Sequence, residues 1–271
     1  MSGFSVRKFY DELAGDYHLM FRDWDASMAY QADVLDGLIR TSLGAGPHTV
    51  LDCSCGIGTQ AIGLARAGHQ VVGSDLSPVA AARAAAEASV RGRRLPTAAA
   101  DMRQLPFKDA SFDVVLCADN SLPHLLSGQD VRAALLGMGR VLRDDGLLLI
   151  TVRAYEESRR SRPTATSPQV SETRDGQVIT FQLWHWHEDG ERYDLEYFQL
   201  TPADGTWRVR VRRSTYWALT TRQVTEFVTE AGFTDITWHS PADGGYYQPV
   251  LTARRAPSAR SRSADAPGPG R

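Results

Sequence analysis

Hydrophobic and polar residues follow two alternating patterns over the first 150 residues of this chain. Short apolar runs are each followed by a stretch in which apolar residues return every three or four positions. The runs are typical of buried β-strands, and the longer stretches are typical of amphipathic helices. The expected strands are 49–52, 70–74, 97–100, 112–117 and 147–152, and the expected helices between them are 60–67, 78–90 and 130–142. Strands that alternate with helices predict an α/β fold with a Rossmann-like, doubly wound, mostly parallel sheet.

Residues 6–40, ahead of the first strand, carry apolar and aromatic side chains at helical spacing, interrupted at 21–27. This spacing predicts two helices joined by an aromatic hinge, which we expect to form an N-terminal lid. Helical spacing returns at 221–231, and two apolar runs follow at 234–239 and 250–254. These predict a last helix and two closing strands, with the last strand antiparallel to the rest of the sheet.

The pattern changes after Val152, where polar residues alternate with apolar or aromatic ones. Such alternation predicts strands with one buried and one exposed face. The alternating segments are 178–187, 192–200 and 207–217, joined by turns at 188–190 and 203–205. Because the turns contain Asp-Gly, they favour hairpins. We therefore predict a three-stranded antiparallel insertion beside the fifth strand, covering the mouth of the active site.

These patterns divide the chain into four expected parts. They are an N-terminal helical lid (1–45), a Rossmann-like core (46–155 and 218–255), a β insertion over the substrate site (156–217) and a tail (256–271). The tail consists mostly of Ser, Ala, Pro, Gly and Arg without periodicity. We expect it to be disordered because it cannot bury enough apolar surface.

The composition is that of a globular enzyme, with a formal net charge of -2 and 42% hydrophobic residues. No apolar run approaches the roughly 20 residues that span a bilayer. Residues 1–11 also lack the apolar region of a signal peptide. Cys53, Cys55 and Cys117 lie in segments predicted to be buried, which suits reduced thiols. We therefore expect a cytoplasmic protein that binds neither membrane nor nucleic acid.

A glycine-bearing turn, residues 51–59 (LDCSCGIGT), joins the first strand to the first helix of the core. Its glycines let the chain turn sharply and let a ligand approach the backbone. Taken alone, the turn also fits an ordinary tight connection between a strand and a helix.

Acidic residues close the next two strands. Asp75, about 17 residues after Gly58, is placed to accept hydrogen bonds from both ribose hydroxyls of a nucleoside. Asp101 is placed to accept from an adenine amino group, with Met102 against the ring. Ligands of open α/β sheets bind at the carboxyl ends of the strands. Three such strand ends therefore predict an adenosine site.

The acidic residue Asp52 distinguishes between two classes of adenosine cofactor. A dinucleotide would set its pyrophosphate on the turn, but the third glycine of the dinucleotide pattern is replaced by Ala61. A carboxylate at Asp52 repels phosphate and attracts a cation, such as the ammonium of an amino acid. The sequence therefore favours S-adenosylmethionine over a nicotinamide dinucleotide.

The motifs resemble those of class I S-adenosylmethionine-dependent methyltransferases. This resemblance is carried by residues 50–78 (VLDCSCGIGTQAIGLARAGHQVVGSDLSP), by Asp101-Met102 and by residues 112–117. Further motifs, 120–124 (NSLPH), 152–155 (VRAY) and 245–249 (GYYQP), are similar to the glycine and sarcosine N-methyltransferase branch. The resemblance covers roughly residues 10–255.

The resemblance implies a set of cofactor residues. They are Trp24, Ser54, Gly56, Asp75, Asp101, Met102, Ala118 and His124, and the turn and second strand add Asp52, Cys55, Gly58 and Leu76. The chain departs from the branch at one position. Where the branch has an arginine on the N-terminal helix to hold the cofactor carboxylate, this chain offers Ser27 and Gln31.

The methyl acceptor is expected beside the loops after the fourth and fifth strands, near Asn120, His124 and Arg153. An arginine that leaves a core strand needs a partner, either a substrate carboxylate or an acidic residue of the insertion. By the resemblance, Tyr17, Tyr216, Tyr246 and Tyr247 also line the substrate site. Ordinary core packing is the alternative for each tyrosine.

Methyl transfer is an in-line displacement in which a neutral amine is already a competent nucleophile. We therefore expect catalysis by positioning, with His124 or Tyr17 as the candidate base if a proton must leave. The first hypothesis is an N-methyltransferase acting on an amine, an amino acid or a nitrogen heterocycle such as an azapteridine. The alternatives are O-methylation of a carboxylate or phenol, and a non-catalytic S-adenosylmethionine-binding protein.

Three other motifs do not indicate a further function. Residues 184–187 (WHWH) lie on a predicted strand, where alternation sets both histidines on one face without a completing ligand, so no metal site is expected. Residues 119–122 (DNSL) lack the signature of base methyltransferases. Arg208, Arg210 and Arg212 are expected on one solvated strand face. The sequence leaves the oligomeric state open.

Overall fold

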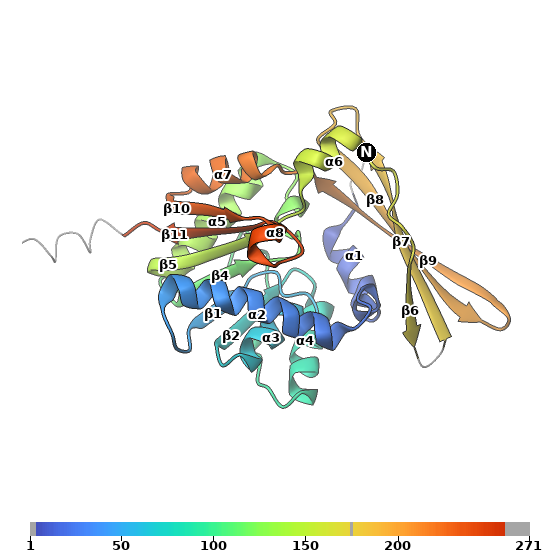
Figure 1. Cartoon of the computed structure of the whole chain (residues 1–271), viewed down its shortest axis with the longest axis horizontal. Coiled ribbons are helices and arrows are strands. Elements are labelled where there is room, and N and C mark those ends of the chain that lie inside the picture. Colours follow the sequence, from blue (N-terminus) through green and yellow to red (C-terminus); the bar gives the residue numbers. More distant parts are fainter. Residues whose placement is uncertain (1–3, 174–175, 258–271) are drawn as a thin grey trace, which may run out of the picture.

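The computed structural model describes residues 4–173 and 176–257 and contains two sheets (Figure 1). In spatial order the first sheet comprises β10 (Phe233–His239), β11 (Val250–Arg255), β5 (Leu142–Thr151), β4 (Phe112–Cys117), β1 (Thr49–Asp52), β2 (Gln70–Asp75) and β3 (Thr97–Ala99). Strand β11 is antiparallel to both neighbours, and the other pairs are parallel. The predicted Rossmann-like sheet with an antiparallel last strand is confirmed. Residues 258–271 of the predicted tail lie outside the described residues.

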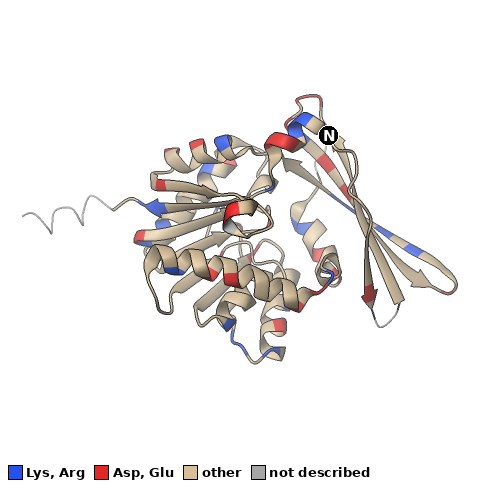
Figure 2. Cartoon of the chain, in the orientation of Figure 1, with Lys and Arg blue, Asp and Glu red and all other residues tan. Residues whose placement is uncertain are grey.

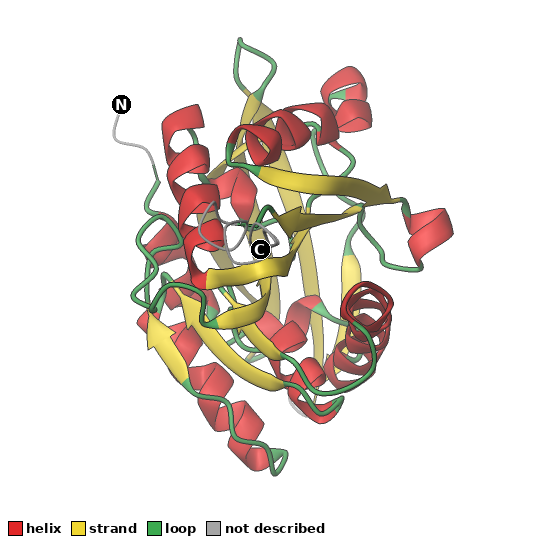
Figure 3. Ribbon diagram, turned by 90° about the vertical axis from the view of Figure 1, so that its left-hand side faces the viewer, coloured by secondary structure: helices red, strands yellow, loops and turns green. Residues whose placement is uncertain are grey.

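Helices cover both faces of this sheet (Figure 1, Figure 3). One face carries α2 (Trp24–Leu43), α3 (Thr59–Arg66) and α4 (Pro78–Val90), and the other carries α5 (Gly128–Val141) and α7 (Thr221–Glu230). Successive side chains of β5 point to opposite faces of the sheet and so contribute to the apolar cores on both faces. Leu147 and Leu149 belong to one apolar cluster, and Leu148 and Ile150 belong to the other.

Strand β5 begins five residues before the predicted start, at Leu142. The sequence Asp144-Asp145-Gly146 suggests a turn, but the structure accommodates it as an irregularity within the strand. Asp145 has a φ of 59°, and the register with β4 shifts between Phe112 and Val114.

The second sheet is antiparallel and has four strands, so the predicted three-stranded insertion was wrong by one strand. Its strands are β6 (Gln169–Thr173), β7 (Gly176–Trp186), β8 (Arg192–Ala203) and β9 (Thr206–Trp217). Strand β6 was missed because Val170, which is 52% exposed, is its only apolar residue.

Helix α1 (Val6–Leu13) lies between the two sheets (Figure 1). Its residues Phe9 and Leu13 share an apolar cluster with Trp184, Tyr193 and other aromatic side chains of the second sheet. The remaining short elements are η1 (Tyr17–Met20), η2 (Leu122–His124), α6 (Tyr155–Ser161) and α8 (Pro241–Gly244). The break between the N-terminal helices spans residues 14–23, not 21–27.

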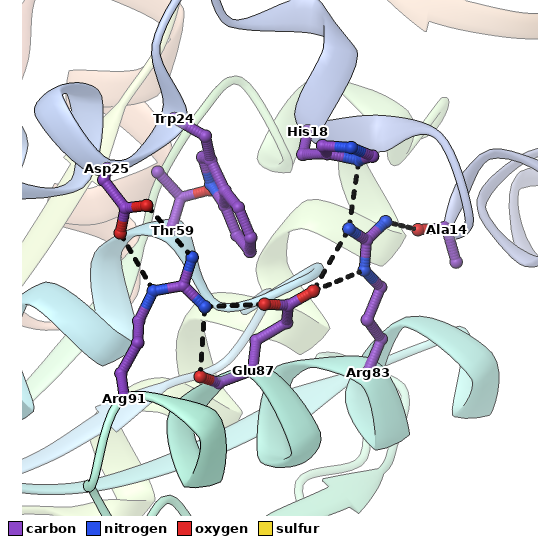
Figure 4. A network of polar contacts seen from close by, with 8 residues as sticks. All are labelled: Ala14, His18, Trp24, Asp25, Thr59, Arg83, Glu87 and Arg91. Carbon is purple, nitrogen blue, oxygen red and sulfur yellow. Dashed lines mark hydrogen bonds and ion pairs between the residues drawn. The ribbon is translucent and has the colours of Figure 1, made fainter. Parts of the chain in front are cut away.

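A network of charged groups ties this N-terminal segment to α4 (Figure 4). Arg83 donates to the carbonyl oxygen of Ala14 and to Nδ1 of His18 at 3.0 Å. The guanidinium groups of Arg83 and Arg91 lie over the Trp24 ring, with their Cζ atoms 5.6 and 4.8 Å from its centroid. The network fixes the segment that carries Tyr17.

Acidic and basic residues are interspersed on the helices and on the second sheet (Figure 2). The predicted solvated arginine face of β9 was wrong at Arg212, which is 5% exposed. Arg212 and Arg210 both pair with Asp16, at 2.9 and 2.8 Å. None of the helices within the described ranges combines the length and the hydropathy that crossing a bilayer requires.

Candidate functional site

The turn between β1 and α3 forms one wall of a cavity because two of its glycines adopt positive φ. Gly56 has a φ of 51° and Gly58 one of 96°. A Cβ atom at Gly58 would lie 2.8 Å from Cδ1 of Ile62, and one at Gly56 would lie 3.4 Å from Cε1 of Tyr17. Glycine is favoured at both positions by the positive φ, and at Gly58 also by the close packing of Ile62.

This first cavity has a volume of about 370 Å³ and lies at the carboxyl ends of the parallel strands. It gathers most of the cofactor residues predicted from the sequence. Those in its lining are Ser54, Cys55, Gly56, Asp75, Leu76, Asp101, Met102 and His124. Trp24, Asp52, Gly58 and Ala118 are not in the lining.

Asp75 is a carboxylate of the first cavity that is held by two backbone amides. Its Oδ2 accepts from the Gly56 amide and its Oδ1 from the Ser77 amide, both at 2.8 Å. Burial raises the pKa of Asp75 above its ordinary value. Each carboxylate oxygen has a second lone pair, so Asp75 can also accept from two ligand hydroxyls.

Asp52 lies behind the turn and is fully buried. Its Oδ1 accepts from the Ser54 amide at 3.3 Å, while its Oδ2 has no hydrogen-bond partner among the described residues. Burial, together with the charges of Asp75 and Asp119, raises the pKa of Asp52 to about 7. An unsatisfied buried carboxylate is costly, and a cation would relieve that cost.

Trp24 lies behind the wall of the first cavity, contrary to the expectation that its side chain lines the cavity. Its Nε1 donates to Oγ1 of Thr59 at 2.9 Å, and Thr59 lines the cavity. Asp101 does line the cavity but is held by Arg103 at 2.6 Å. Hydrogen bonds from Arg103 lower the pKa of Asp101, so this carboxylate stays ionised.

A second cavity of about 670 Å³ lies between the first sheet, α1 and the second sheet. The predicted substrate residues in its lining are Tyr17, Asn120, Arg153, Tyr216 and Tyr247. The second sheet contributes Thr180, Gln182, Leu195, Tyr197 and Tyr216.

Tyr246 is buried outside this lining, and its hydroxyl donates to Oε1 of Gln31 at 2.7 Å. The same oxygen accepts from Nε2 of Gln60 at 2.8 Å. Gln31, a candidate for the cofactor carboxylate, therefore uses its side-chain oxygen in protein contacts, and it lines the second cavity and not the first. The other candidate, Ser27, lines the second cavity and not the first.

Asn120 joins two of the strand-end loops. Its Nδ2 donates to the hydroxyl of Tyr155 at 2.8 Å, and its Oδ1 accepts from the Arg153 amide at 3.1 Å. The side chain that was predicted to bind substrate therefore has a structural role in this arrangement.

Arg153 presents a cation to the second cavity. Its guanidinium lies over the Trp184 ring, 4.9 Å from the centroid, and makes only long contacts of 3.4 and 3.5 Å to Oε1 of Gln182. Within the described ranges Arg153 forms no ion pair with a carboxylate, and Asp119 acts on it only through a charge interaction. The structure therefore favours a ligand anion over an acidic residue of the insertion as its partner.

The two candidate bases are poorly suited to accept a proton. Nε2 of His124 lies 2.8 Å from the hydroxyl of Tyr10, and Nδ1 lies 3.3 Å from Oγ of Ser214. Burial lowers the pKa of His124 to about 3, which makes it a weak base. Burial also raises the pKa of Tyr17 well above 10, so its phenol stays protonated.

The two cavities meet at three residues that line both, Tyr10, Tyr17 and Asp119. Sequence reasoning missed Tyr10 and Asp119. Asp119 lies just beyond the carboxyl end of β4, so the argument that selected Asp75 and Asp101 could also have found it.

His185 and His187, considered above as metal ligands, pair instead with Glu196 at 3.4 Å and Asp194 at 3.3 Å. The part of the chain that the structure describes holds no cluster of three or more metal-binding side chains.

Comparisons with known proteins agree with this geometry. Residues 50–146 match the family model described as a methyltransferase domain. A glycine/sarcosine N-methyltransferase of Parasynechococcus marenigrum (strain WH8102) is 36% identical over 136 residues, 49% of this chain and 47% of that protein. The chain spans about half the length of the curated relatives it matches.

Two solved structures share the fold over most of this chain. The CcbJ methyltransferase from Streptomyces caelestis has a TM-score of 0.75 and 15% identity, covering 93% of this chain and 100% of its own. CalS10 from Micromonospora echinaspora, an amino pentose methyltransferase solved with bound S-adenosylmethionine, has a TM-score of 0.67 and 20% identity, covering 85% and 92%. At these identities the likeness shows a Rossmann-like methyltransferase fold.

Proposed function

We propose that this chain is an S-adenosylmethionine-dependent methyltransferase that methylates a nitrogen of a small acceptor carrying a carboxylate. One observation supports this above the others. Two cavities meet at Tyr10, Tyr17 and Asp119. Four carboxylates line the first cavity together with Arg7 and Arg103, and the second cavity holds the cation Arg153. The name of the N-methyltransferase relative supports nitrogen as the target.

The residues of the first cavity fit S-adenosylmethionine. Asp75 suits the ribose hydroxyls, and the unpartnered Oδ2 of Asp52, buried behind the cavity wall, would attract the ammonium of the cofactor's amino-acid part. Asp101 and Met102 would face the adenine. When bound, the cofactor supplies a methyl group on a positively charged sulfur.

The residues of the second cavity would orient the acceptor. Arg153 can bind a carboxylate through two parallel N–H donors, with the indole of Trp184 behind it. Tyr17 and Tyr216 add aromatic walls that exclude water from the junction. Since His124 is a weak base, these residues would act chiefly by alignment.

The proposal is tested with labelled S-adenosylmethionine and a panel of amino acids, aromatic amines with a carboxylate, phenols and azaheterocycles. The methyl ester of each carboxylic acid serves as its matched control. We expect the label on nitrogen, only in acceptors with a free carboxylate. Label on a phenol oxygen, or equal labelling of an acid and its ester, would contradict the proposal.

Replacing Asp52 by asparagine should change both stability and binding in a pH-dependent way. The ordinary pKa of 3.8 is raised to about 7 in the folded state, so ionising Asp52 destabilises the fold. This destabilisation is absent near pH 4 and complete above pH 7. Asp52→Asn should therefore raise the free energy of unfolding by up to about 4 kcal/mol at pH 8, and by little at pH 4.

The same variant should bind S-adenosylhomocysteine less tightly than the wild type at pH 8, because the ammonium loses its carboxylate. Urea unfolding and calorimetry at both pH values measure the two effects. A variant that gains no stability at pH 8, or that keeps full affinity there, would refute this role of Asp52.

Thr59 is our candidate for the cofactor carboxylate in place of the missing arginine. It begins α3, where Gly58 provides no side-chain cap, so the amides of the first turn remain available. Because Nε1 of Trp24 donates to Oγ1 of Thr59, the Thr59 hydroxyl hydrogen is left to donate to an anion.

Thr59→Val should lower the affinity for S-adenosylhomocysteine about tenfold, the effect of one hydrogen bond to a charged group. Binding of 5′-methylthioadenosine, which lacks the amino-acid part, should stay the same. Thr59→Ser should retain wild-type affinity for both. Calorimetry measures the affinity of each variant for the two nucleosides. An equal loss of affinity for both would mean that Thr59 only supports the turn.

A further inference from the structure

Asp119 occupies a backbone conformation that is unfavourable for most residues. Its φ is 57° and that of Asn120 is 64°. Residues other than glycine adopt such φ values at an energetic cost. The conformation is held by the Asp119 amide, which donates to Oγ1 of Thr151 at 2.8 Å. It directs the chain across the junction of the two cavities.

The side chain of Asp119 is held on one side only. Its Oδ1 accepts from the hydroxyl of Tyr247, and its Oδ2 makes no hydrogen bond to any described residue. Burial raises the pKa of Asp119 above its ordinary value. The ionisable groups around it are Tyr10 and Tyr17 from the N-terminal segment, Asp52, Arg153 after β5, and Tyr246 and Tyr247 before β11.

Among the described residues, Asp119 is the only carboxylate that lines both cavities. Asp75 lies in the first cavity and is engaged by two backbone amides, and Asp52 lies behind the turn. An amine that enters the second cavity with its carboxylate on Arg153 must bring its nitrogen to the junction. At neutral pH the nitrogen of an aliphatic amine is an ammonium, which cannot attack a methyl group.

We propose that Asp119 binds the ammonium of the acceptor at the junction and takes one proton from it, an inference that rests on the proposed function. The carboxylate becomes a carboxylic acid and the ammonium becomes a neutral amine. The freed lone pair forms the carbon–nitrogen bond as the bond from methyl carbon to sulfur breaks, with its electron pair left on sulfur. The product leaves as a methylated ammonium, and Asp119 releases its proton to solvent.

Sinefungin tests the placement of Asp119 without an acceptor, because it carries an amine where S-adenosylmethionine carries its transferable methyl. Asp119→Asn keeps the shape of the side chain and an oxygen for Tyr247. We expect calorimetry to show that the variant binds sinefungin at least about tenfold more weakly than the wild type. Its affinity for S-adenosylhomocysteine should be almost unchanged. Asp235→Asn is the matched control, since Asp235 also has a positive φ, 50°, but lies outside both cavities.

A second measurement tests proton transfer, using the acceptor found in the panel. The loss of kcat/KM in Asp119→Asn should be largest at low pH. It should shrink as the pH approaches the pKa of the free acceptor, where the amine is already neutral. An unchanged ratio of sinefungin to S-adenosylhomocysteine affinity, or an equal kinetic loss at every pH, would overturn the inference. If the wild-type protein binds neither nucleoside, the proposed function fails, and this inference fails with it.

Discussion

Replacing Asp75 by alanine is expected to lower the affinity for S-adenosylhomocysteine by at least about 100-fold. The carboxylate would accept two hydroxyl hydrogen bonds, each worth roughly 1.5 to 3 kcal/mol because the acceptor is charged. Asp75 also holds the Gly56 and Ser77 amides at 2.8 Å. Its loss would therefore remove ribose contacts and loosen the turn that faces the nucleoside.

Ser77→Ala is the matched control for the second effect. Ser77 accepts from the Ala80 amide at 3.0 Å as the cap of α4, its Oγ donates to Asp11 of α1, and it does not line the first cavity. Loss of this cap should cost about 1 kcal/mol of stability and leave nucleoside affinity nearly unchanged. Calorimetry and thermal melts of both variants separate binding from stability. Wild-type affinity in Asp75→Ala would contradict the nucleoside site.

Arg153→Met is expected to raise the KM for a carboxylate-bearing acceptor by roughly 30-fold to 1,000-fold, the effect of losing about 2 to 4 kcal/mol from a bidentate pair. Nucleoside affinity should hardly change, since Arg153 lines only the second cavity. The melting temperature should stay the same or rise, because the variant removes a cation without a carboxylate partner in the described structure.

Arg159→Met provides the structural comparison. Arg159 donates to the Ala218 carbonyl oxygen at 2.8 Å, to Gln223 at 2.8 Å and to Glu191 at 3.1 Å, so its loss should lower the melting temperature without raising KM. Substrate-saturation curves and thermal melting curves measure KM and the melting temperature of the two variants. If Arg153→Met behaves like Arg159→Met, the carboxylate site is refuted.

The sequence predicted those features that depend on local pattern. Strands 49–52 and 112–117 were predicted with their observed bounds because each is a short, mostly apolar segment ended by a change of residue type. Strand β6 escaped because its pairing with β7, and not its own hydrophobicity, makes it a strand. The start of β5 was missed because Asp-Asp-Gly is typical of a turn, whereas Leu142, which precedes it, still pairs with Phe112 of β4.

The candidate site was predictable where strand ends supply the residues, as for Asp75 and Asp101. Properties set by distant neighbours were not predictable. His124 is a weak base because residues far apart in sequence, Tyr10 and Tyr216 among them, enclose it. The position of Trp24 behind Thr59 likewise depends on how α2 packs on α3, which no local pattern specifies.

Helix α1 contributes to the walls of both cavities, with Val6 and Arg7 in the first, Phe9 and Leu13 in the second, and Tyr10 in both. Ligands bound in the two cavities would therefore both contact a single eight-residue element, which would couple their binding equilibria. A ligand that binds more tightly when α1 is packed between the two sheets lowers the conformational free energy that binding of the other ligand must supply. By thermodynamic linkage the effect is reciprocal, so each ligand strengthens the binding of the other by the same factor.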